Sequence, residues 1–179
     1  MPPPLTRDRI LDAAMHIVRD QGVAKLTLDE AARVAGLSKG GVLYHFKSKD
    51  DLIRGMVSRM TESCDALHLR YYAEQPEGPY RWARTVVHTA FDPEGPGGDP
   101  ASGALLAAIA INPELMAPIH EKYAQWVERV KSDSPDPLKA ALICTAMDGF
   151  VFQRILGLTL ATDEDLTRLK ELALDMLKE

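Results

Sequence analysis

The stretch at residues 34–49 reads VAGLSKGGVLYHFKSK, and we expect it to form the end of one helix, a tight turn, a second short helix and the cap of a third. Gly36 can adopt the left-handed conformation that ends a helix, and Ser38 can accept a backbone N–H at the start of the next one. Two helices joined by such a turn form a helix-turn-helix. This order of residues therefore predicts a helix-turn-helix.

The second helix of this motif carries side chains that suit nucleic-acid binding. We expect Lys39, Tyr44 and His45 to face outward, since lysine donates to guanine and tyrosine and histidine donate to phosphates. Gly40 and Gly41 each cost about 1 kcal/mol of helix propensity relative to alanine, and close approach of the backbone to a DNA groove is a benefit that offsets this cost. An ordinary helical hairpin with solvent-facing lysine and histidine is the alternative on spacing alone. The residues available to pack inward are Leu37, Val42, Leu43 and Phe46.

Residues 6–53 resemble the N-terminal DNA-binding domain of the tetracycline-repressor (TetR) family, on the run GLSKGGVLYHFKSK from Gly36 to Lys49. The resemblance implies a ligand-responsive transcriptional regulator: a repressor that binds a palindromic double-stranded DNA operator as a homodimer and is released by a small, largely apolar effector. It also implies DNA contacts, with Lys39 at base edges and the other residues mainly at phosphates or in close backbone approach. The matching positions are Thr27, Ser38, Lys39, Gly40, Gly41, Tyr44, His45 and Lys49. Leu43 stands where many members have tyrosine, so the operator sequence is not carried over.

Composition supports a protein that touches DNA with one end only. The chain has 179 residues, 46% of them hydrophobic, and a net charge of −5, which argues against coating of nucleic acid by bulk charge. Residues 1–60 contain ten Lys and Arg against seven Asp and Glu, whereas residues 61–179 contain eleven against nineteen. A mildly basic N-terminal part therefore precedes an acidic body.

Several classes of protein are disfavoured by the sequence. No apolar run reaches the length of a membrane span, and Met1–Thr6 lacks the features of a signal peptide, so we expect a cytoplasmic protein that does not bind membranes. Cys64 and Cys144 have no metal-type spacing, and buried free thiols are expected, with a redox switch as the alternative. The five histidines form no metal pair, and no nucleophile or dinucleotide motif occurs. We therefore expect that the protein is not an enzyme and binds neither a metal nor a cofactor.

The helical periodicity predicts an all-α fold. Helices at residues 6–22 and 27–35 complete a three-helix, helix-turn-helix domain at residues 1–48. A connecting helix at residues 49–72, about 36 Å long, leads into a helical effector-binding and dimerisation domain at residues 49–179. That second domain includes helices from Pro79 to Asp92, from Ser102 to Ile111 as a buried helix, and from Pro113 to Val130. Residues 92–100 contain three prolines and three glycines, and we expect an irregular, mobile surface loop there.

The last two predicted helices carry more apolar surface than one chain can cover. Residues 138–160 are apolar on nearly every side, and residues 162–178 form another apolar stripe. Two such helices from each of two subunits would close a four-helix bundle. The candidate dimer interface consists of Phe152, Leu156, Leu166, Leu169, Ala173 and Met176.

The resemblance also implies an effector pocket in the second domain, and soft, aromatic side chains from five helices give independent support. Asp148 and Arg154 are costly to bury alone, so they either orient a ligand or pair across the dimer. A plain filled core is the alternative for any one of these residues. The candidate ligand-binding residues are Met60, Cys64, Leu67, Trp82, Val86, Ile109, Tyr123, Trp126, Met147, Asp148 and Phe150.

A helical carrier or adaptor that binds a small molecule without DNA is the alternative function. Its body would have the same helical pattern. It would, however, have no need for Lys39, Tyr44, His45 and Lys49 around a glycine-rich turn. Binding to DNA is therefore the property that separates the two hypotheses.

Overall fold

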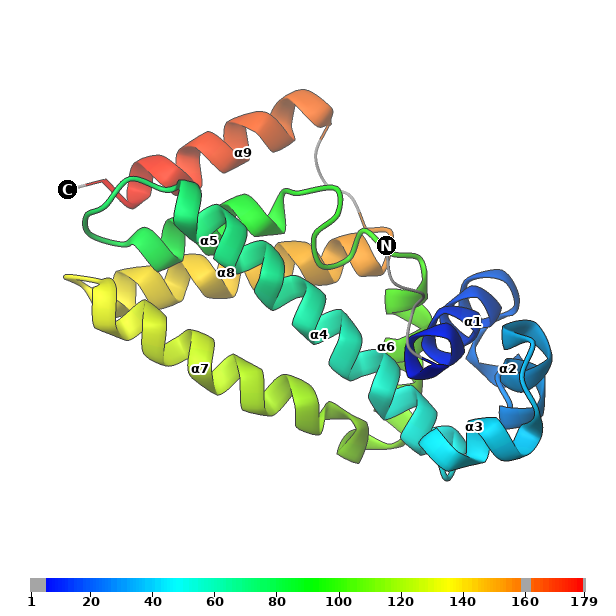
Figure 1. Ribbon diagram of the computed structural model, residues 1–179. Coiled ribbons are helices and arrows are strands. Elements are labelled where there is room, and N and C mark those ends of the chain that lie inside the picture. The colour runs from blue at the N-terminus through cyan, green and yellow to red at the C-terminus, as the bar shows by residue number, and fades with distance from the viewer. Residues whose placement is uncertain (1–5, 159–161, 179) are drawn as a thin grey trace. The chain divides into compact units, whose positions relative to one another are not determined.

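The computed structural model describes residues 6–158 and 162–178, and every regular element in these ranges is a helix (Figure 1). The predicted all-α fold is confirmed. Residues 159 and 160, at the end of the predicted helix 138–160, and Met1–Leu5, the start of the segment interpreted as lacking a signal peptide, lie outside the described residues.

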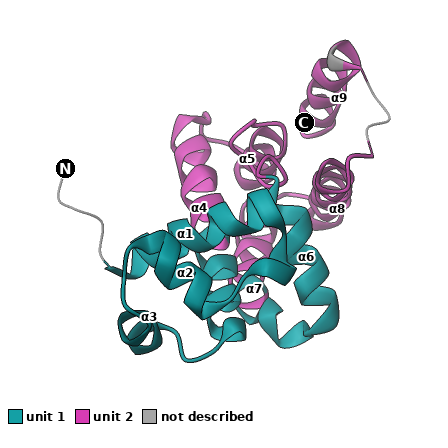
Figure 2. Ribbon diagram, turned by 90° about the vertical axis from the view of Figure 1, so that its right-hand side faces the viewer, with its two compact units in different colours: residues 1–60, 100–119 teal, residues 61–99, 120–179 magenta. Residues whose placement is uncertain are grey.

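The chain forms two compact units (Figure 2). Unit 1 contains residues 1–60 and 100–119, and unit 2 contains residues 61–99 and 120–179. Helix α4 (Lys49–Glu74) belongs to both, with residues 49–60 in unit 1. The compact units thus divide the chain differently from the expected functional domains at residues 1–48 and 49–179, because the start of α4 and helix α6 (Ala101–Ile111) share the core of unit 1. The functional division stays a prediction.

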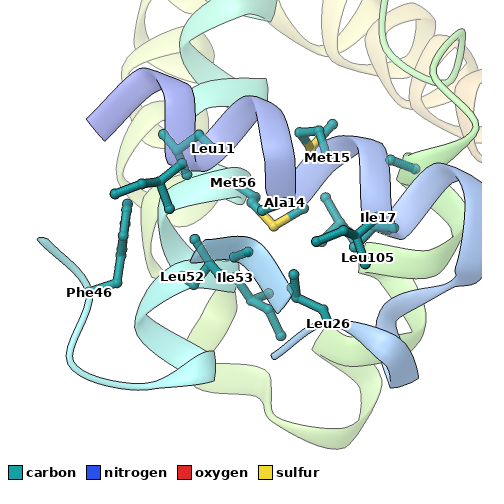
Figure 3. Close-up of a cluster of buried hydrophobic side chains, with 14 of the residues drawn as sticks. Leu11, Ala14, Met15, Ile17, Leu26, Phe46, Leu52, Ile53, Met56 and Leu105 are labelled. Carbon is teal, nitrogen blue, oxygen red and sulfur yellow. The ribbon is translucent and has the colours of Figure 1, made fainter. Parts of the chain in front are cut away.

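Unit 1 surrounds an apolar core that α1 (Thr6–Gln21) organises. Helix α1 buries Ile10, Leu11, Ala14 and Ile17 at helical spacing, with no exposed surface on any of them. Figure 3 shows Leu11, Ala14 and Ile17 of α1 meeting side chains of α4 and α6. The partners labelled there include Leu26, Phe46, Leu52, Ile53, Met56 and Leu105. The core therefore holds the N-terminal helices to the first turns of α4.

The helix-turn-helix consists of α2 (Leu28–Ala35) and α3 (Lys39–His45). Gly36 has φ 66° and ends α2 in the left-handed conformation, as the sequence predicts. The Ser38 Oγ accepts a hydrogen bond from the Gly41 N–H at 3.1 Å and caps α3. A short 3₁₀ helix, η1 (Val23–Lys25), precedes α2 and was not predicted.

Helices α2 and α4 each begin with a capping side chain, but neither forms a complete capping box. Thr27 Oγ1 accepts from the Glu30 N–H at 3.0 Å and caps α2, but the Glu30 carboxylate binds Arg33. Ser48 Oγ accepts from the Asp51 N–H at 3.0 Å at the start of α4, whereas the Asp51 carboxylate accepts from the N–H of Lys47 rather than of the cap. Both helices still begin where the sequence predicts.

Unit 2 contains α5 (Arg81–Ala90), most of α7 (Ala117–Asp133), α8 (Pro137–Ile155) and α9 (Asp163–Met176). Helix α5 packs against both α8 and α9. Thr162 and Asp165 form a complete capping box at the start of α9. Helix α5 begins at Arg81, two residues later than expected, after Tyr80 in a left-handed conformation with φ 59°.

Two expectations for the middle of the chain need correction. The loop at residues 92–99 is irregular, but Asp92 is buried because it accepts hydrogen bonds from Arg70 and Tyr71 of α4. Helix α6 is not buried all round: Leu105 and Ala108 face the core of unit 1, whereas Ile111 is 86% exposed. Between α6 and α7 lies a second 3₁₀ helix, η2 (Pro113–Met116), which Asn112 caps.

Candidate functional site

Helix α3 presents polar side chains to solvent on one side and apolar ones to the core on the other. Val42 and Phe46 are buried, and Leu37 and Leu43 are partly buried. Tyr44, by contrast, is 77% exposed. The predicted division of this helix into an inner and an outer face is therefore confirmed. The other candidate DNA-binding side chains lie on this part of unit 1, with Thr27, Ser38 and Lys39 exposed and His45 and Lys49 partly buried.

The candidate base-contacting residue, Lys39, forms an ion pair within unit 1. Its Nζ lies 3.0 Å from Oδ1 and 3.1 Å from Oδ2 of Asp29 on α2. Both side chains are largely exposed, so the pair is weak and can exchange for other partners. Lys39 is therefore free to leave Asp29 when a stronger anionic partner approaches.

The two other lysines of this region are held by backbone carbonyls. Lys49 Nζ donates to the carbonyl of Val23 at 2.8 Å and so ties η1 to the start of α4. Lys47 Nζ donates to the carbonyls of Leu43 and Tyr44, the last acceptors of α3, and lies 5.8 Å from the centroid of the Tyr44 ring. Lys47 was not among the candidate residues, although its position near the C-terminus of a short helix signals this contact.

The glycines of α3 are not required by the packing of unit 1. A Cβ on Gly40 would meet only the Ser38 Oγ, at 4.0 Å, and one on Gly41 would meet it at 3.4 Å, which is ordinary contact. Gly55 of α4 is different, because its Cβ would lie 2.7 Å from Cε1 of Phe46. The cost of two glycines in α3 is thus unexplained by the fold and points to an external partner.

The candidate ligand-binding residues separate between the two units. Met60 and Ile109 pack against the core of unit 1, and the remaining nine belong to unit 2. Of those nine, Leu67, Trp82 and Met147 are buried, and Asp148 and Tyr123 are exposed. The nine residues of unit 2 can therefore be described together, and four of them are partly buried: Cys64, Val86, Trp126 and Phe150.

His68 of α4 lies among aromatic rings in the interior of unit 2. Its ring centroid is 5.6 Å from that of Trp82 and 4.7 Å from that of Trp126. Burial lowers the pKa of His68 to about 4, although the Asp65 carboxylate favours the protonated form. Within the described residues, neither His68 Nδ1 nor Trp82 Nε1 has a hydrogen-bond partner. Two buried polar atoms are therefore available to a polar group or water.

Asp65 anchors this region and was not predicted from the sequence. It accepts a hydrogen bond from Trp126 Nε1 at 2.7 Å and pairs with Lys122 at 3.0 Å. Burial raises the pKa of Asp65, but the bonds from Trp126 and Lys122 outweigh it, and the pKa lies below its ordinary value. A carboxylate directly after the candidate ligand-binding residue Cys64 was the signal that could have identified it.

Asp148 and Arg154 have different roles. Tyr123 Oη donates to Asp148 at 2.7 Å, and this bond raises the pKa of Tyr123 to about 12. Desolvation raises the pKa of Asp148, and the bond from Tyr123 offsets this only in part. Arg154 Nη1 donates to the carbonyls of Ala90 and Asp92 and so caps the end of α5. Arg154 therefore supports the fold of unit 2.

Both cysteines of unit 2 are free and partly buried. Burial raises the pKa of Cys64 and of Cys144 to about 12, and nearby carboxylates add to the shift. Such thiols are protonated at neutral pH and react slowly, which disfavours the redox alternative. In the part of the chain that the structure describes, no three His, Cys, Asp or Glu side chains are grouped as metal ligands.

The candidate dimer residues lie on α8 and α9 or directly after α8. Phe152, Leu156, Leu169 and Met176 are exposed, and Leu166 is partly exposed. Ala173 is buried, because it lies on the face of α9 that packs into the core of unit 2. Four leucines of this region that are not among the candidates are exposed as well: Leu138, Leu142, Leu158 and Leu172.

Two family models match this chain. Residues 10–56 match the model described as bacterial regulatory proteins, tetR family. Residues 80–178 match the model described as tetracyclin repressor-like, C-terminal domain. Together they match parts of both compact units, and the second alone covers more than half of the chain. No helix of residues 6–158 and 162–178 has both the length and the apolar character to cross a membrane.

Curated proteins similar to the chain are HTH-type transcriptional regulators. AcrR of Shigella flexneri is 34% identical over 82 residues, which is 46% of this chain and 38% of the relative. SrpR of Pseudomonas putida is 42% identical over 53 residues, 30% of this chain and 25% of the relative. TtgR of Pseudomonas putida is 29% identical over 87 residues, 49% and 41% respectively. The chain thus spans less than half the length of each of these relatives.

Solved structures resemble the whole chain in fold. A TetR-family member from Streptomyces coelicolor A3, SCO1917, superposes with a TM-score of 0.72 at 23% identity and covers 98% of this chain and 100% of its own. The multidrug binding protein EbrR, in complex with imidazole, gives a TM-score of 0.63 at 23% identity and covers 98% and 97%. At this identity the likeness concerns the fold alone.

Proposed function

Because the chain belongs to the tetracycline-repressor family of bacterial regulatory proteins, we propose that it acts in the cytoplasm as a ligand-responsive repressor. In this proposal a homodimer binds a palindromic DNA operator through α3, and a small, largely apolar effector releases it. The matched families consist of transcriptional regulators and not of enzymes. One observation carries the proposal: α3 exposes Lys39 and Tyr44 beside two glycines that the packing of unit 1 does not need.

The polar face of α3 has the chemistry of a major-groove helix. Lys39 stands at the first position of the helix, and its exposed ion pair leaves it able to reach a base edge. Tyr44 and His45 follow about one and a half turns later, with their rings in an edge-to-face contact at 5.1 Å. Gly40 allows the backbone to approach phosphates or bases closely. We assign base contacts to Lys39 and phosphate contacts to Thr27, Tyr44, His45 and Lys49.

The apolar face of α8 supports dimerisation. One series of exposed residues, on α8 and directly after it, recurs at alternating steps of four and three, which is the spacing of a helix-packing seam. Gly149 lies within this series, and a Cβ there would meet nothing in the chain, so two α8 helices can approach each other closely at this point. The series runs Leu138, Leu142, Thr145, Gly149, Phe152, Leu156. A second copy of the chain is the partner that we propose for this face and for the exposed leucines of α9.

The interior of unit 2 supports an effector site. Trp82, Trp126 and His68 supply aromatic walls, and the unpartnered Trp82 Nε1 and His68 Nδ1 supply one donor and one further polar atom. A largely apolar effector with one or two polar atoms fits this combination. We propose that its binding shifts the dimer toward a spacing of the α3 helices that mismatches the operator, with a coupling free energy of about 1–3 kcal/mol.

Selection of bound genomic fragments tests the DNA part of the proposal. We expect a roughly palindromic sequence with half-sites about one helical turn, or a multiple of it, apart. Lys39→Ala should reduce the preference for one base pair of the selected fragment by about 1–3 kcal/mol. Lys49→Ala should weaken binding to every DNA sequence to the same extent, and it should lower the slope of log affinity against log salt concentration by about one. Lys131→Ala, which removes an exposed lysine from unit 2, is the matched control. An unchanged affinity and salt slope for Lys49→Ala would remove that lysine from the interface.

A screen of hydrophobic small molecules tests the effector part. Compounds that bind should raise the thermal stability of the protein and release the selected DNA together. Trp126→Phe keeps an aromatic ring but removes the hydrogen bond to Asp65, so it should weaken a releasing compound without unfolding unit 2. If every stabilising compound left DNA affinity unchanged, the helical carrier would be the better description of unit 2.

A further inference from the structure

The Lys39–Asp29 ion pair places a negative charge within the proposed DNA interface. The two residues belong to different helices of the helix-turn-helix, and both carboxylate oxygens lie within 3.1 Å of the ammonium nitrogen. The pair therefore presents a strong donor and a strong acceptor side by side. Lys39 is 62% exposed and Asp29 is 68% exposed, so both are accessible to a third partner.

The fold of unit 1 has little use for this charge. An exposed ion pair contributes little to folding stability, and the core of unit 1 is formed by apolar side chains of other residues. Asp29 lies in the first turn of α2, where a negative charge interacts favourably with the helix dipole, but this effect is also small at the surface. The charge of Asp29 is thus best explained by what approaches this surface.

A carboxylate at this position opposes unselective binding to DNA. Asp29 follows Thr27, the α2 cap that we assign to a phosphate, by only two residues. Phosphates that approach Thr27 therefore approach Asp29 as well, and the like charges repel each other. Lys39 must in addition leave Asp29 before it can bind a phosphate or a base. Both effects lower the affinity for DNA that does not donate a hydrogen bond to Asp29.

A G·C base pair can donate such a hydrogen bond. In the major groove, guanine presents the acceptors O6 and N7, and cytosine presents the N4 amino donor beside them. A lysine donor next to a carboxylate acceptor is complementary to this edge. An A·T pair does not fit the same arrangement, because it places the adenine N6 donor where guanine has O6 and the thymine O4 acceptor where cytosine has N4.

We propose that Asp29 is a specificity-determining residue that acts with Lys39 to select a G·C pair in each half-site and to reject other DNA. This inference rests on the proposed function, since it requires α3 to bind the major groove. Asp29 lowers the affinity for DNA that lacks the G·C pair, and it leaves the affinity for the operator nearly unchanged because cytosine N4 satisfies it.

The test compares Asp29→Asn with Glu128→Gln. Glu128 forms an exposed ion pair with Lys131 at 3.0 Å in unit 2, so its variant makes the same change in net charge away from unit 1. Affinity is measured for the tightest genomic fragment selected by the wild-type protein and for a scrambled duplex of the same length and composition, over a series of salt concentrations. Asp29→Asn should raise the affinity for the scrambled duplex about fivefold and leave that for the selected fragment within about twofold. Glu128→Gln should alter neither by more than about twofold.

A repeated selection gives the second readout. The wild-type protein should select one G·C pair per half-site that Asp29→Asn no longer selects, whereas Asp29→Glu, which keeps the charge, should retain it. If Asp29→Asn lowers the melting temperature of the protein, Asp29→Ser repeats the test with another small polar residue in the first turn of α2.

Three outcomes overturn the inference. If Asp29→Asn raised the affinity for both duplexes equally, Asp29 would act only through the net charge of the protein. If it changed neither affinity, DNA would not contact Asp29. Persistence of the G·C preference in Asp29→Asn would assign that preference to other residues. A wild-type protein that binds selected and scrambled DNA alike would instead contradict the proposed function itself, and the two failures are thereby distinguished.

Discussion

The interiors and surfaces of the two units show opposite chemistry. Unit 1 has an apolar interior, in which Ser102 is the one buried polar residue among those that the structure describes, and it exposes polar groups on α3. Unit 2 buries Thr61, His68, Thr85, Thr89, Asp92 and Ser134, and it exposes leucines and a phenylalanine on α8 and α9. Buried polar groups and exposed apolar ones are the unusual case for a protein that acts alone.

This difference indicates where each partner binds. Unit 1 folds by apolar packing and uses its surface for a polar, anionic partner, which we propose to be DNA. Unit 2 uses its surface for an apolar partner, which we propose to be a second copy, and its interior for an effector. Substitutions in one unit should therefore affect the partner that we assign to that unit.

The exposed apolar surface of unit 2 carries the largest expected effect. Phe152→Arg places a charge in the proposed seam, and an unpaired charge in an apolar interface should raise the dimer dissociation constant about 1,000-fold, or about 4 kcal/mol. Sedimentation should then report a monomer that has lost tight operator binding. Leu69→Arg is the control, because Leu69 of α4 is 46% exposed and Phe152 is 49% exposed. A dimeric Phe152→Arg protein would place the interface elsewhere.

The polar interior of unit 2 predicts a pH dependence of stability. His68 takes up a proton near pH 6.5 when the chain is unfolded, but only at about 4 in the folded protein. The free energy of unfolding should therefore be highest above pH 6.5 and fall by about 3 kcal/mol as the pH drops from 6.5 to 4. His68→Phe keeps a ring between the tryptophans and should lack this part of the fall. Denaturant unfolding of both proteins across this range measures it, and parallel curves would exclude His68.

The sequence predicts more of unit 1 than of unit 2, and the reason is physical. In unit 1 the signals are local: Gly36 needs a left-handed conformation, Ser38 caps α3, and the periodicity of α1 defines the core. The position and outer face of α3 could therefore be predicted. Caps and periods do not determine contacts between helices distant in sequence, so the inclusion of α6 in unit 1 and the pair of Asp29 with Lys39 became visible only in the structure.

Unit 2 shows the limit of composition more clearly. Trp82, Trp126 and Met147 were identified from their side-chain type, and they lie in unit 2 as expected. Met60 and Ile109 have the same side-chain character but pack in unit 1, because the division of α4 and the position of α6 depend on tertiary packing. The same argument applies to Arg154, whose charge signalled a special role but not that its partner is the end of α5.

The close packing of unit 1 predicts an intermediate effect at Gly55. A Cβ there would lie 2.7 Å from the buried Phe46 ring and 3.2 Å from Leu11, so Gly55→Ala should lower the free energy of unfolding by about 1–3 kcal/mol. Chemical denaturation measures the change, and DNA affinity should fall only as far as the folded fraction does. A stability equal to that of the wild type would show that the core near α3 can rearrange.

The smallest expected change in stability gives the most direct test of the claim that α3 is shaped for a partner and not for the fold. Gly40→Ala adds a methyl group that meets only the Ser38 Oγ at 4.0 Å, so the fold should tolerate it and gain up to about 1 kcal/mol of helix propensity. Affinity for the selected DNA should nevertheless fall about tenfold, because the methyl group blocks the close approach of the backbone. Thermal unfolding and DNA titration of the same preparation should therefore move in opposite directions. A variant that binds DNA as tightly as the wild-type protein would contradict the account.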